Sequence, residues 1–194
     1  MALPDLFESS RRQLDPTGVL SALGGAPPSG TTLAFTMQHQ LETEWCWAAV
    51  STSVSLFYLS GSSWTQCKVV EAELGEDSCC DDGRTKECNI PWYLQKALTR
   101  TGNLNAMSAG SLPYASVNAE IKNGRPLGCR IGWTLGGGHF VVIHGYINKH
   151  VGAATETWVE VADPWYGASS LPYNDFRTKY QNSGSWTHSY TTRP

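Results

Sequence analysis

A cysteine at the expected start of a helix is the residue in this chain best suited to nucleophilic chemistry. Cys46 stands in Glu44-Trp45-Cys46-Trp47-Ala48-Ala49, where a helical pattern begins. The partial positive charge at a helix N-terminus stabilises a thiolate, which is the reactive form of cysteine. Six residues upstream, Gln40 offers amide N–H groups to an oxyanion forming beside the sulfur. We therefore expect Cys46 to be a nucleophile and Gln40 an oxyanion donor.

A nucleophilic cysteine requires a base, and histidine has a suitable pKa. Of five histidines, three lie in segments typical of loops or surface: His39, His150 and His188. The other two, His139 and His144, lie on one expected strand and face opposite sides, because strand side chains alternate. Three glycines that let a substrate approach precede His139, so we predict this residue as the base. We interpret His144 as a core histidine with a satisfied hydrogen bond.

The base in turn needs an acceptor that holds its tautomer. Asp163 ends the strand that follows the histidine strand, and an antiparallel return can bring it beside His139. Asp-Pro pairs also initiate turns, so Asp163 taken alone would be an ordinary turn residue. Asp175 is the rival acid, and we assign it to capping or solvating a short helix over 175–180. These residues together predict a Cys–His–Asp triad.

The other five cysteines form one buried residue and one cluster. Cys129 lies in an apolar strand pattern and is expected in the core. The cluster consists of Cys67, Cys79, Cys80 and Cys88, which suit two disulfides, a zinc site or, in a reducing compartment, free thiols. Zinc sites usually have two separated C-x(2–4)-C pairs, which are missing here, so we favour disulfides and expect no metal. A bridge between adjacent cysteines would be strained. Cys67 and Cys88 should therefore each pair with one of the adjacent residues, in an order that the sequence leaves open.

The composition is that of an ordinary globular domain. The chain has 194 residues with 41% hydrophobic and 16% charged residues and a formal net charge of −3. The absence of a basic run argues against nucleic acid and anionic lipid as partners, and no apolar run reaches the ~20 residues that cross a bilayer. The N-terminus is acidic and has no apolar stretch, which argues against export by the general secretory route. We expect a monomer without a membrane or nucleic-acid partner.

The periodicity of the chain predicts helices first and strands second. Residues 1–31, rich in Gly, Pro and Ser towards their end, are expected to be a leader or linker, and residues 32–194 one catalytic domain. Helical patterns start at Cys46, after Ser62-Ser63, after Asn89 and at Ala115. Strand patterns cover 127–133, 139–147, 157–161 and 185–191. These patterns predict an α+β fold of two lobes with a cleft between them.

The order of these motifs resembles that of the papain-like cysteine proteases over residues 32–194. Gln40 precedes Cys46-Trp47, and the strand from His139 continues into Gly145-Tyr146. The segment Asp163-Pro164-Trp165-Tyr166-Gly167 is similar to the family's Asn-Ser-Trp-Gly, with aspartate in place of asparagine. The resemblance implies a papain-like two-lobed fold with a helical N-terminal half and an antiparallel, β-barrel-like C-terminal half. It also implies peptide hydrolysis without a cofactor.

Two departures favour a compact bacterial branch of that family. Thr43-Glu44 replace the Cys-Gly of papain, and the interval from Cys46 to His139 is shorter than the roughly 130–150 residues of papain and cathepsins. The Trp-Cys-Trp-Ala-Ala form is similar to avirulence-effector and staphopain-like proteases. This likeness implies a secreted effector or toxin, delivered into a target cell by a specialised, signal-peptide-independent route. Ala22-Leu23-Gly24-Gly25 is similar to a self-processing site, although a flexible linker explains the same glycines.

The resemblance also implies roles for the site residues. Cys46 attacks a peptide carbonyl, the Cys46 N–H and Gln40 hold the oxyanion, His139 transfers protons and Asp163 orients it. Trp165 would shield the His–Asp hydrogen bond, and Trp47 would support the nucleophile. The partners would be a protein substrate and an immunity or inhibitor protein. Two alternatives stay open: a transglutaminase- or deamidase-type enzyme with the same triad, and a catalytically dead binding module.

Overall fold

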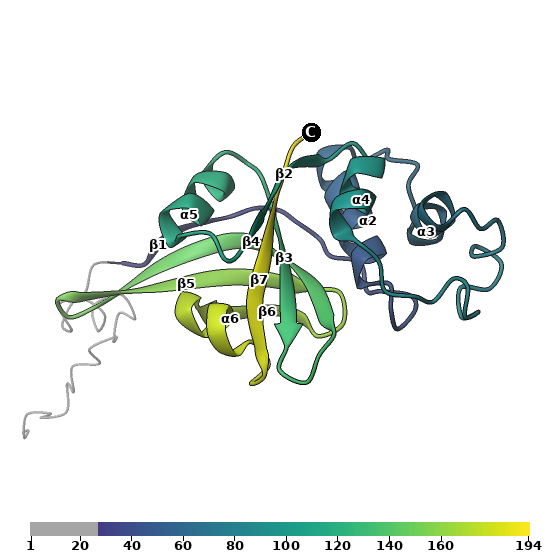
Figure 1. Cartoon of the computed structure of the whole chain (residues 1–194). Coiled ribbons are helices and arrows are strands. Elements are labelled where there is room, and N and C mark those ends of the chain that lie inside the picture. The colour runs from purple at the N-terminus through teal and green to yellow at the C-terminus, as the bar shows by residue number, and fades with distance from the viewer. Residues whose placement is uncertain (1–26) are drawn as a thin grey trace, which may run out of the picture.

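Helices dominate the first half of the chain and strands the second (Figure 1). The computed structural model describes residues 27–194, so most of the predicted leader, including Gly24-Gly25, lies outside the described residues. The helices are α2 (Cys46–Tyr58), α3 (Gln66–Leu74), α4 (Leu94–Arg100), α5 (Tyr114–Lys122) and α6 (Tyr173–Lys179). The strands are β1 (Ser29–Thr32), β2 (Leu104–Ala109), β3 (Leu127–Trp133), β4 (Gly138–Val151), β5 (Ala154–Asp163), β6 (Gly167–Pro172) and β7 (Gly184–Thr192). None of the described helices has the length and apolar character that a membrane span requires.

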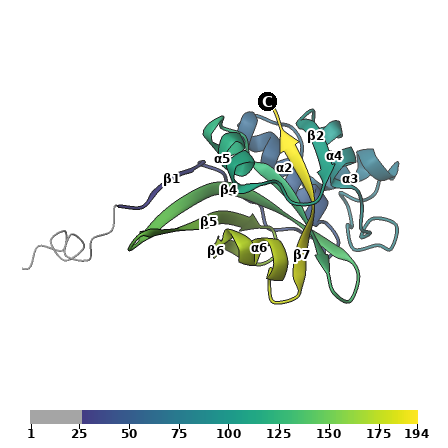
Figure 2. The same ribbon diagram turned by 60° about the vertical axis from the view of Figure 1, so that its left-hand side comes forward.

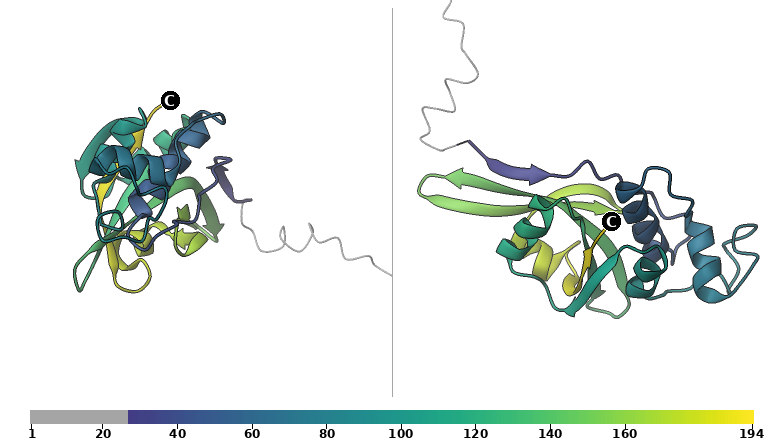
Figure 3. Two further views of the ribbon diagram at one scale, coloured as in Figure 1. Left: turned by 90° about the vertical axis from the view of Figure 1, so that its right-hand side faces the viewer. Right: turned by 90° about the horizontal axis from the view of Figure 1, so that it is seen from above.

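All seven strands belong to one antiparallel sheet. The strand order is β2-β7-β3-β4-β5-β6, and β1 pairs with the distal part of β4. The long β4–β5 hairpin curves away from α2, α3 and α4, and β1 runs along its edge (Figures 1 and 3). The α+β prediction is confirmed. Because β1 begins at Ser29, the sheet includes residues that the sequence interpretation assigned to the linker, and the boundary at 31/32 stays a prediction.

The alternation of side chains along β4 places a hydrophobic core on each face of the sheet. Phe140 and Val142 pack into the core shared with α2, α3 and α4. Val141 and Ile143 pack into the core shared with α5 and α6. Figure 2 shows α2, α3 and α4 grouped together and α6 on the other side of β5, and Figure 1 shows α5 apart from that group. The two cores are thus the two lobes, and the strands that separate them also carry the candidate site.

Some predicted boundaries were wrong for reasons visible in the structure. Helix α2 starts at Cys46 as predicted, but α3 starts at Gln66 and its cap is Thr65, whose hydroxyl accepts a hydrogen bond from Lys68 N. Asn89 does not cap α4, which begins only at Leu94. Strands β2 and β6 were not predicted because they are edge strands with largely exposed side chains, which lack the alternation that marks a strand.

Two disulfides staple the segment between α3 and α4. Cys67 bonds to Cys80, and Cys79 bonds to Cys88. The disulfide prediction is confirmed, and the structure supplies the pairing that the sequence left open. Cys46 and Cys129 are free and buried. Burial raises the pKa of the Cys129 thiol well above its ordinary value, as suits a core residue.

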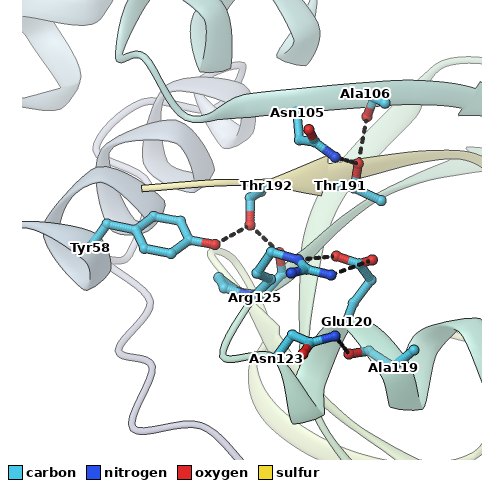
Figure 4. A network of polar contacts seen from close by, with 10 residues as sticks. Tyr58, Asn105, Ala106, Ala119, Glu120, Asn123, Arg125, Thr191 and Thr192 are labelled. Atoms are coloured by element: carbon cyan, nitrogen blue, oxygen red, sulfur yellow. Dashed lines mark hydrogen bonds and ion pairs between the residues drawn. The ribbon is translucent and has the colours of Figure 1, made fainter.

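The far end of α2 is fastened to the sheet by a polar network (Figure 4). Thr192 of β7 donates its hydroxyl hydrogen to the Pro126 carbonyl at 2.6 Å, so the Tyr58 hydroxyl must be the donor in its 2.7 Å contact with Thr192. Beside them, Arg125 makes two hydrogen bonds to the carboxylate of Glu120, at 2.7 and 3.0 Å. The helix that begins at the candidate nucleophile is therefore anchored at its opposite end as well.

Candidate active site

Cys46 is the first residue of α2 and is almost completely buried. The preceding residue, Trp45, provides no side-chain hydrogen bond to the helix start. The first N–H groups of a helix have no acceptor within the helix. Those of α2 can therefore bind an anion. A thiolate or an oxyanion at this position receives the favourable field of the helix N-terminus.

His139 and Asp163 lie together although 24 residues separate them. The ring nitrogen Nε2 of His139 is 2.8 Å from Oδ1 of Asp163, and both side chains are buried. The antiparallel pairing of β4 with β5, with Val142 opposite Ala162, returns the chain to the start of β4 and so produces this contact. Because Nε2 faces Asp163, Nδ1 is the nitrogen left to face the sulfur.

The charges in this group favour an imidazolium at His139. Burial alone would lower the pKa of His139, but hydrogen bonds and charge from Asp163 and Cys46 outweigh it and raise the pKa to about 9. Burial would likewise raise the pKa of Asp163, but the hydrogen bond and charge of His139, aided by the N–H of Tyr166 and the hydroxyl of Tyr180, lower it. Cys46 contributes to this raised pKa through a hydrogen bond and through charge, so its side chain lies near the His139 ring. The structure thus brings the three predicted triad residues together.

Two aromatic rings flank His139, and sequence reasoning gave a role to neither of them. The Trp133 ring stacks on His139 with centroids 6.2 Å apart, and Tyr166 meets it edge-on at 6.1 Å. Trp165 is 47% exposed and stacks on His39 instead, at 5.7 Å. No local pattern marks Trp133, which reaches the ring because β3 pairs with β4 and Gly132 lies opposite Gly138.

The loop after Asp163 binds the aspartate through its backbone. Oδ1 accepts hydrogen bonds from Trp165 N at 2.7 Å and Tyr166 N at 2.9 Å, in addition to that from His139. The Pro164 carbonyl accepts from Gln40 N at 3.0 Å, which joins this loop to the segment before the nucleophile. Asp163 therefore does both things that its sequence suggested: it forms a turn with Pro164, and it contacts the histidine.

Gln40 is buried beside the site, but its amide has partners in its own turn. Nε2 lies 2.8 Å from both the Glu42 and Thr43 carbonyl oxygens. Oε1 is buried without a hydrogen-bond partner among the described residues. Serving as an oxyanion donor would require Nε2 to share or release one of its hydrogens. The predicted role of Gln40 thus depends on a local adjustment when substrate binds.

The segment before Cys46 is held by the cysteine-rich loop, defined here as residues 75–93. The Trp45 indole N–H donates to the Cys88 carbonyl at 2.8 Å, and that of Trp47 donates to the Ile90 carbonyl at 3.1 Å. Asn89 accepts from Glu44 N at 2.9 Å. Trp47 is completely buried. Trp45 contacts the loop in the same way as Trp47, but sequence reasoning gave it no role. Its position next to Cys46 in the sequence could have indicated one.

The other candidate histidines and the rival acid lie elsewhere. His144 is half-buried at an irregularity of the β4–β5 pairing, with Nδ1 3.4 Å from the Leu33 carbonyl. His150 contacts Thr155 near the tip of the β4–β5 hairpin, and His188 contacts Thr187 on β7. Asp175 pairs with Lys179 one turn further along α6. We interpret these residues as structural.

A cavity of about 410 Å³ opens beside His139. It lies between the two lobes, with walls from the segment before Cys46, the end of the cysteine-rich loop, the glycine turn at 136–138 and the loop after Asp163. Its lining residues are Gln40, Thr43, Glu44, Pro91, Trp133, Gly137, Gly138, His139, Trp165 and Tyr166. Among the described residues, no cluster of histidine, cysteine and acidic side chains could hold a metal ion.

Comparisons with known proteins show which family this chain resembles. The family model described as papain-like cysteine protease AvrRpt2 matches residues 29–181, which is more than half of the chain. A search of curated proteins finds no match. Among solved structures, a double glycine motif protease from an AMS/PCAT transporter, in complex with its leader peptide, is similar over 84% of this chain and 95% of that one, with 18% identity and a TM-score of 0.46. On the strength of the family match, the chain belongs to the family of the papain-like cysteine protease AvrRpt2.

Proposed function

We propose that the chain is an endopeptidase in which Cys46 and His139 carry out the covalent chemistry. The observation that supports this most directly is the buried His139–Asp163 hydrogen bond, with a His139 pKa raised to about 9 in part by Cys46. A protonated imidazole beside a sulfur at a helix N-terminus is the arrangement that activates a cysteine.

The proposed reaction has two covalent steps. The Cys46 thiolate attacks the peptide carbonyl carbon, which forms a C–S bond and places negative charge on the oxygen. The Cys46 N–H is the first donor for that oxygen, and the Gln40 amide is the second once its turn adjusts. His139 then gives its proton to the leaving amine as the C–N bond breaks. In the second step His139 takes a proton from water, which attacks the thioester and releases the acid and the thiolate.

Exposed apolar side chains around the site support a polypeptide substrate. Large hydrophobic residues rarely stay exposed in groups unless they bind something. Leu41, Leu135, Trp165 and Tyr166 are all exposed on the segments that border or adjoin the cavity beside His139. A second cavity of about 600 Å³ shares Pro91 with the first, and its walls include Trp92, Tyr93, Met107, Phe140 and Tyr190. An extended peptide with large apolar side chains fits this surface.

The test compares two variants that each lose one free cysteine. The full chain, Cys46→Ala and Cys129→Ala are incubated with denatured protein, and new N-termini are mapped by mass spectrometry. We expect Cys46→Ala to produce no new termini and Cys129→Ala to cleave as the wild type does, because Cys129 lies in the sheet core away from the site. Equal cleavage by Cys46→Ala would reject the mechanism, and absence of cleavage by the wild type would reject the activity.

The same experiment separates hydrolysis from transfer. Adding a primary amine to the wild-type reaction would produce amide adducts if the enzyme were a transglutaminase, whereas a peptidase yields free carboxyl ends. A binding module without activity would fail both assays, and iodoacetamide would not label its Cys46 preferentially. The protease family match favours hydrolysis.

The biological setting is proposed from the family likeness. We propose a bacterial effector or toxin that acts as a monomer in a target cell, with residues 1–31 as a leader that is processed at Gly24-Gly25 and with an inhibitor protein in the producing cell. The two disulfides are compatible with passage through an oxidising environment. Expression in cells of the target type, followed by N-terminal sequencing of the recovered chain, tests the processing at Gly24-Gly25.

A further inference from the structure

Both carboxylate oxygens of Asp163 accept hydrogen bonds, but only one of the two oxygens contacts His139. Oδ1 faces His139 and the backbone of the following loop. Oδ2 accepts a hydrogen bond from the Tyr180 hydroxyl at 2.7 Å, and this is its single partner among the described residues. The Asp163 side chain has no exposed surface. Removing the Tyr180 hydroxyl would therefore leave a buried charged oxygen without a donor.

Tyr180 is itself held firmly in place. It directly follows α6 and is 2% exposed, and its ring packs on Phe176 at 5.4 Å. Its carbonyl accepts from Gly184 N at 2.8 Å, which closes a turn in which Gln181 and Asn182 adopt positive φ angles of 47° and 66°. Such a turn ties the end of α6 to the start of β7. The hydroxyl is thus delivered to Asp163 by two elements that do not otherwise belong to the site.

This turn also packs against Trp133, the ring that stacks on His139. A Cβ added at Gly184 would lie 2.7 Å from the Trp133 ring, which stacks on His139. Burial and the neighbouring Asp163 carboxylate raise the pKa of the Tyr180 phenol far above its ordinary value, so the hydroxyl stays protonated. It remains a donor wherever Asp163 is ionised.

We propose that Tyr180 is a positioning residue of the active site, which holds the Asp163 carboxylate from the side opposite His139 and thereby fixes the imidazole. Without Tyr180 every donor to the carboxylate lies at Oδ1, so the carboxylate can tilt about that oxygen, and a tilted carboxylate no longer holds the imidazole in one orientation. Tyr180 does not line the cavity beside His139, so its effect is on turnover rather than on substrate binding. This inference rests on the proposed peptidase function.

The test removes one hydroxyl and keeps the ring. We expect Tyr180→Phe to lower kcat about tenfold with KM unchanged, since one lost hydrogen bond to a charged group corresponds to about one factor of ten. The control is Tyr173→Phe at the other end of α6, because the Tyr173 hydroxyl donates to the Leu112 carbonyl in the same core but does not contact Asp163. Tyr173→Phe should keep the wild-type kcat. Thermal unfolding of both variants verifies that the assay temperature lies below their transitions.

A double-mutant cycle distinguishes positioning from a general structural effect. In an Asp163→Ala background the carboxylate is gone, so Tyr180→Phe should cause no further loss of kcat. The same tenfold loss in both backgrounds would overturn the proposal, as would a kcat for Tyr180→Phe within twofold of the wild type. If the wild type and Cys46→Ala do not differ, the peptidase function has failed instead, and the two failures are therefore distinguishable.

Discussion

At the scale of single residues, the charge on His139 is set by a balance between burial and its neighbours. Burial opposes the charge, whereas Asp163 and Cys46 favour it by hydrogen bonds and by their own charges, and the result is a pKa of about 9. Two uncharged rings also lie against His139, since Trp133 stacks on it and Tyr166 meets it edge-on. A histidine with a folded-state pKa above its ordinary value of 6.5 adds stability that is complete below about pH 6.5 and is lost as the pH rises through about 9.

The activity should depend on pH in the same window. In the proposed mechanism the leaving amine takes its proton from His139, so we expect kcat/KM to fall as the pH rises through about 9. Asp163→Asn should keep turnover, since an amide oxygen still accepts from the ring. It should also move the alkaline limb to lower pH, because the negative charge is lost. The pH dependence of kcat/KM for both forms checks this, with circular dichroism at each pH as the control for folding. An alkaline limb at the same pH in both forms would contradict it.

At the scale of elements, the cysteine-rich loop is a brace for the candidate nucleophile. Its backbone carbonyls at Cys88 and Ile90 accept from the indoles of Trp45 and Trp47, and Asn89 binds the Glu44 N–H. The two disulfides act at different places in this brace. Cys79–Cys88 closes the loop at the residue that contacts Trp45, whereas Cys67–Cys80 ties the loop back to α3.

Removing each disulfide should therefore have different consequences. Both Cys79→Ser/Cys88→Ser and Cys67→Ser/Cys80→Ser should lower the free energy of unfolding by about 2–4 kcal/mol, as closing a loop of this size typically contributes. Only the first pair should also lower kcat severalfold, because it releases the carbonyl that holds Trp45 beside Cys46. Urea unfolding and steady-state kinetics at a fixed low temperature provide the two measurements. Equal effects of the two double variants on kcat would show that the brace acts as a whole.

At the scale of the whole molecule, the two lobes are joined at both ends of α2. Near the site, Gln40 N donates to the Pro164 carbonyl, and His39 stacks on Trp165. At the far end, Tyr58 donates to Thr192 (Figure 4). A site built from two lobes depends on these junctions, because Cys46 comes from one lobe and His139 from the other.

The far junction should contribute to stability without taking part in catalysis. Tyr58→Phe removes one hydrogen bond between the lobes, so the free energy of unfolding should fall by about 1 kcal/mol while kcat stays at the wild-type value. Tyr93→Phe is the control for stability, since the Tyr93 side chain is 56% exposed. Chemical denaturation monitored by tryptophan fluorescence measures both. A fall in kcat for Tyr58→Phe would mean that the far junction also sets the geometry of the site.

Local patterns in the sequence predicted the triad because each member has a local signature. Helical periodicity placed Cys46 at the start of α2, and strand alternation separated His139 from His144. The adjacency of Cys79 and Cys80 limited the disulfides to two pairings. These patterns depend only on residues that are close in the sequence, so they can be recognised without the tertiary structure.

Tertiary structure alone decided the contacts that complete the site. The choice of Cys67–Cys80 with Cys79–Cys88, the stacking of Trp133 on His139 and the hydrogen bond from Tyr180 to Asp163 all join segments distant in sequence. No periodic pattern in the sequence predicts these contacts, because they depend on the register of paired strands and on where a helix ends against the sheet. The sequence by itself thus determined which groups are the candidates for the chemistry. The packing of the two lobes decided what holds those groups in place.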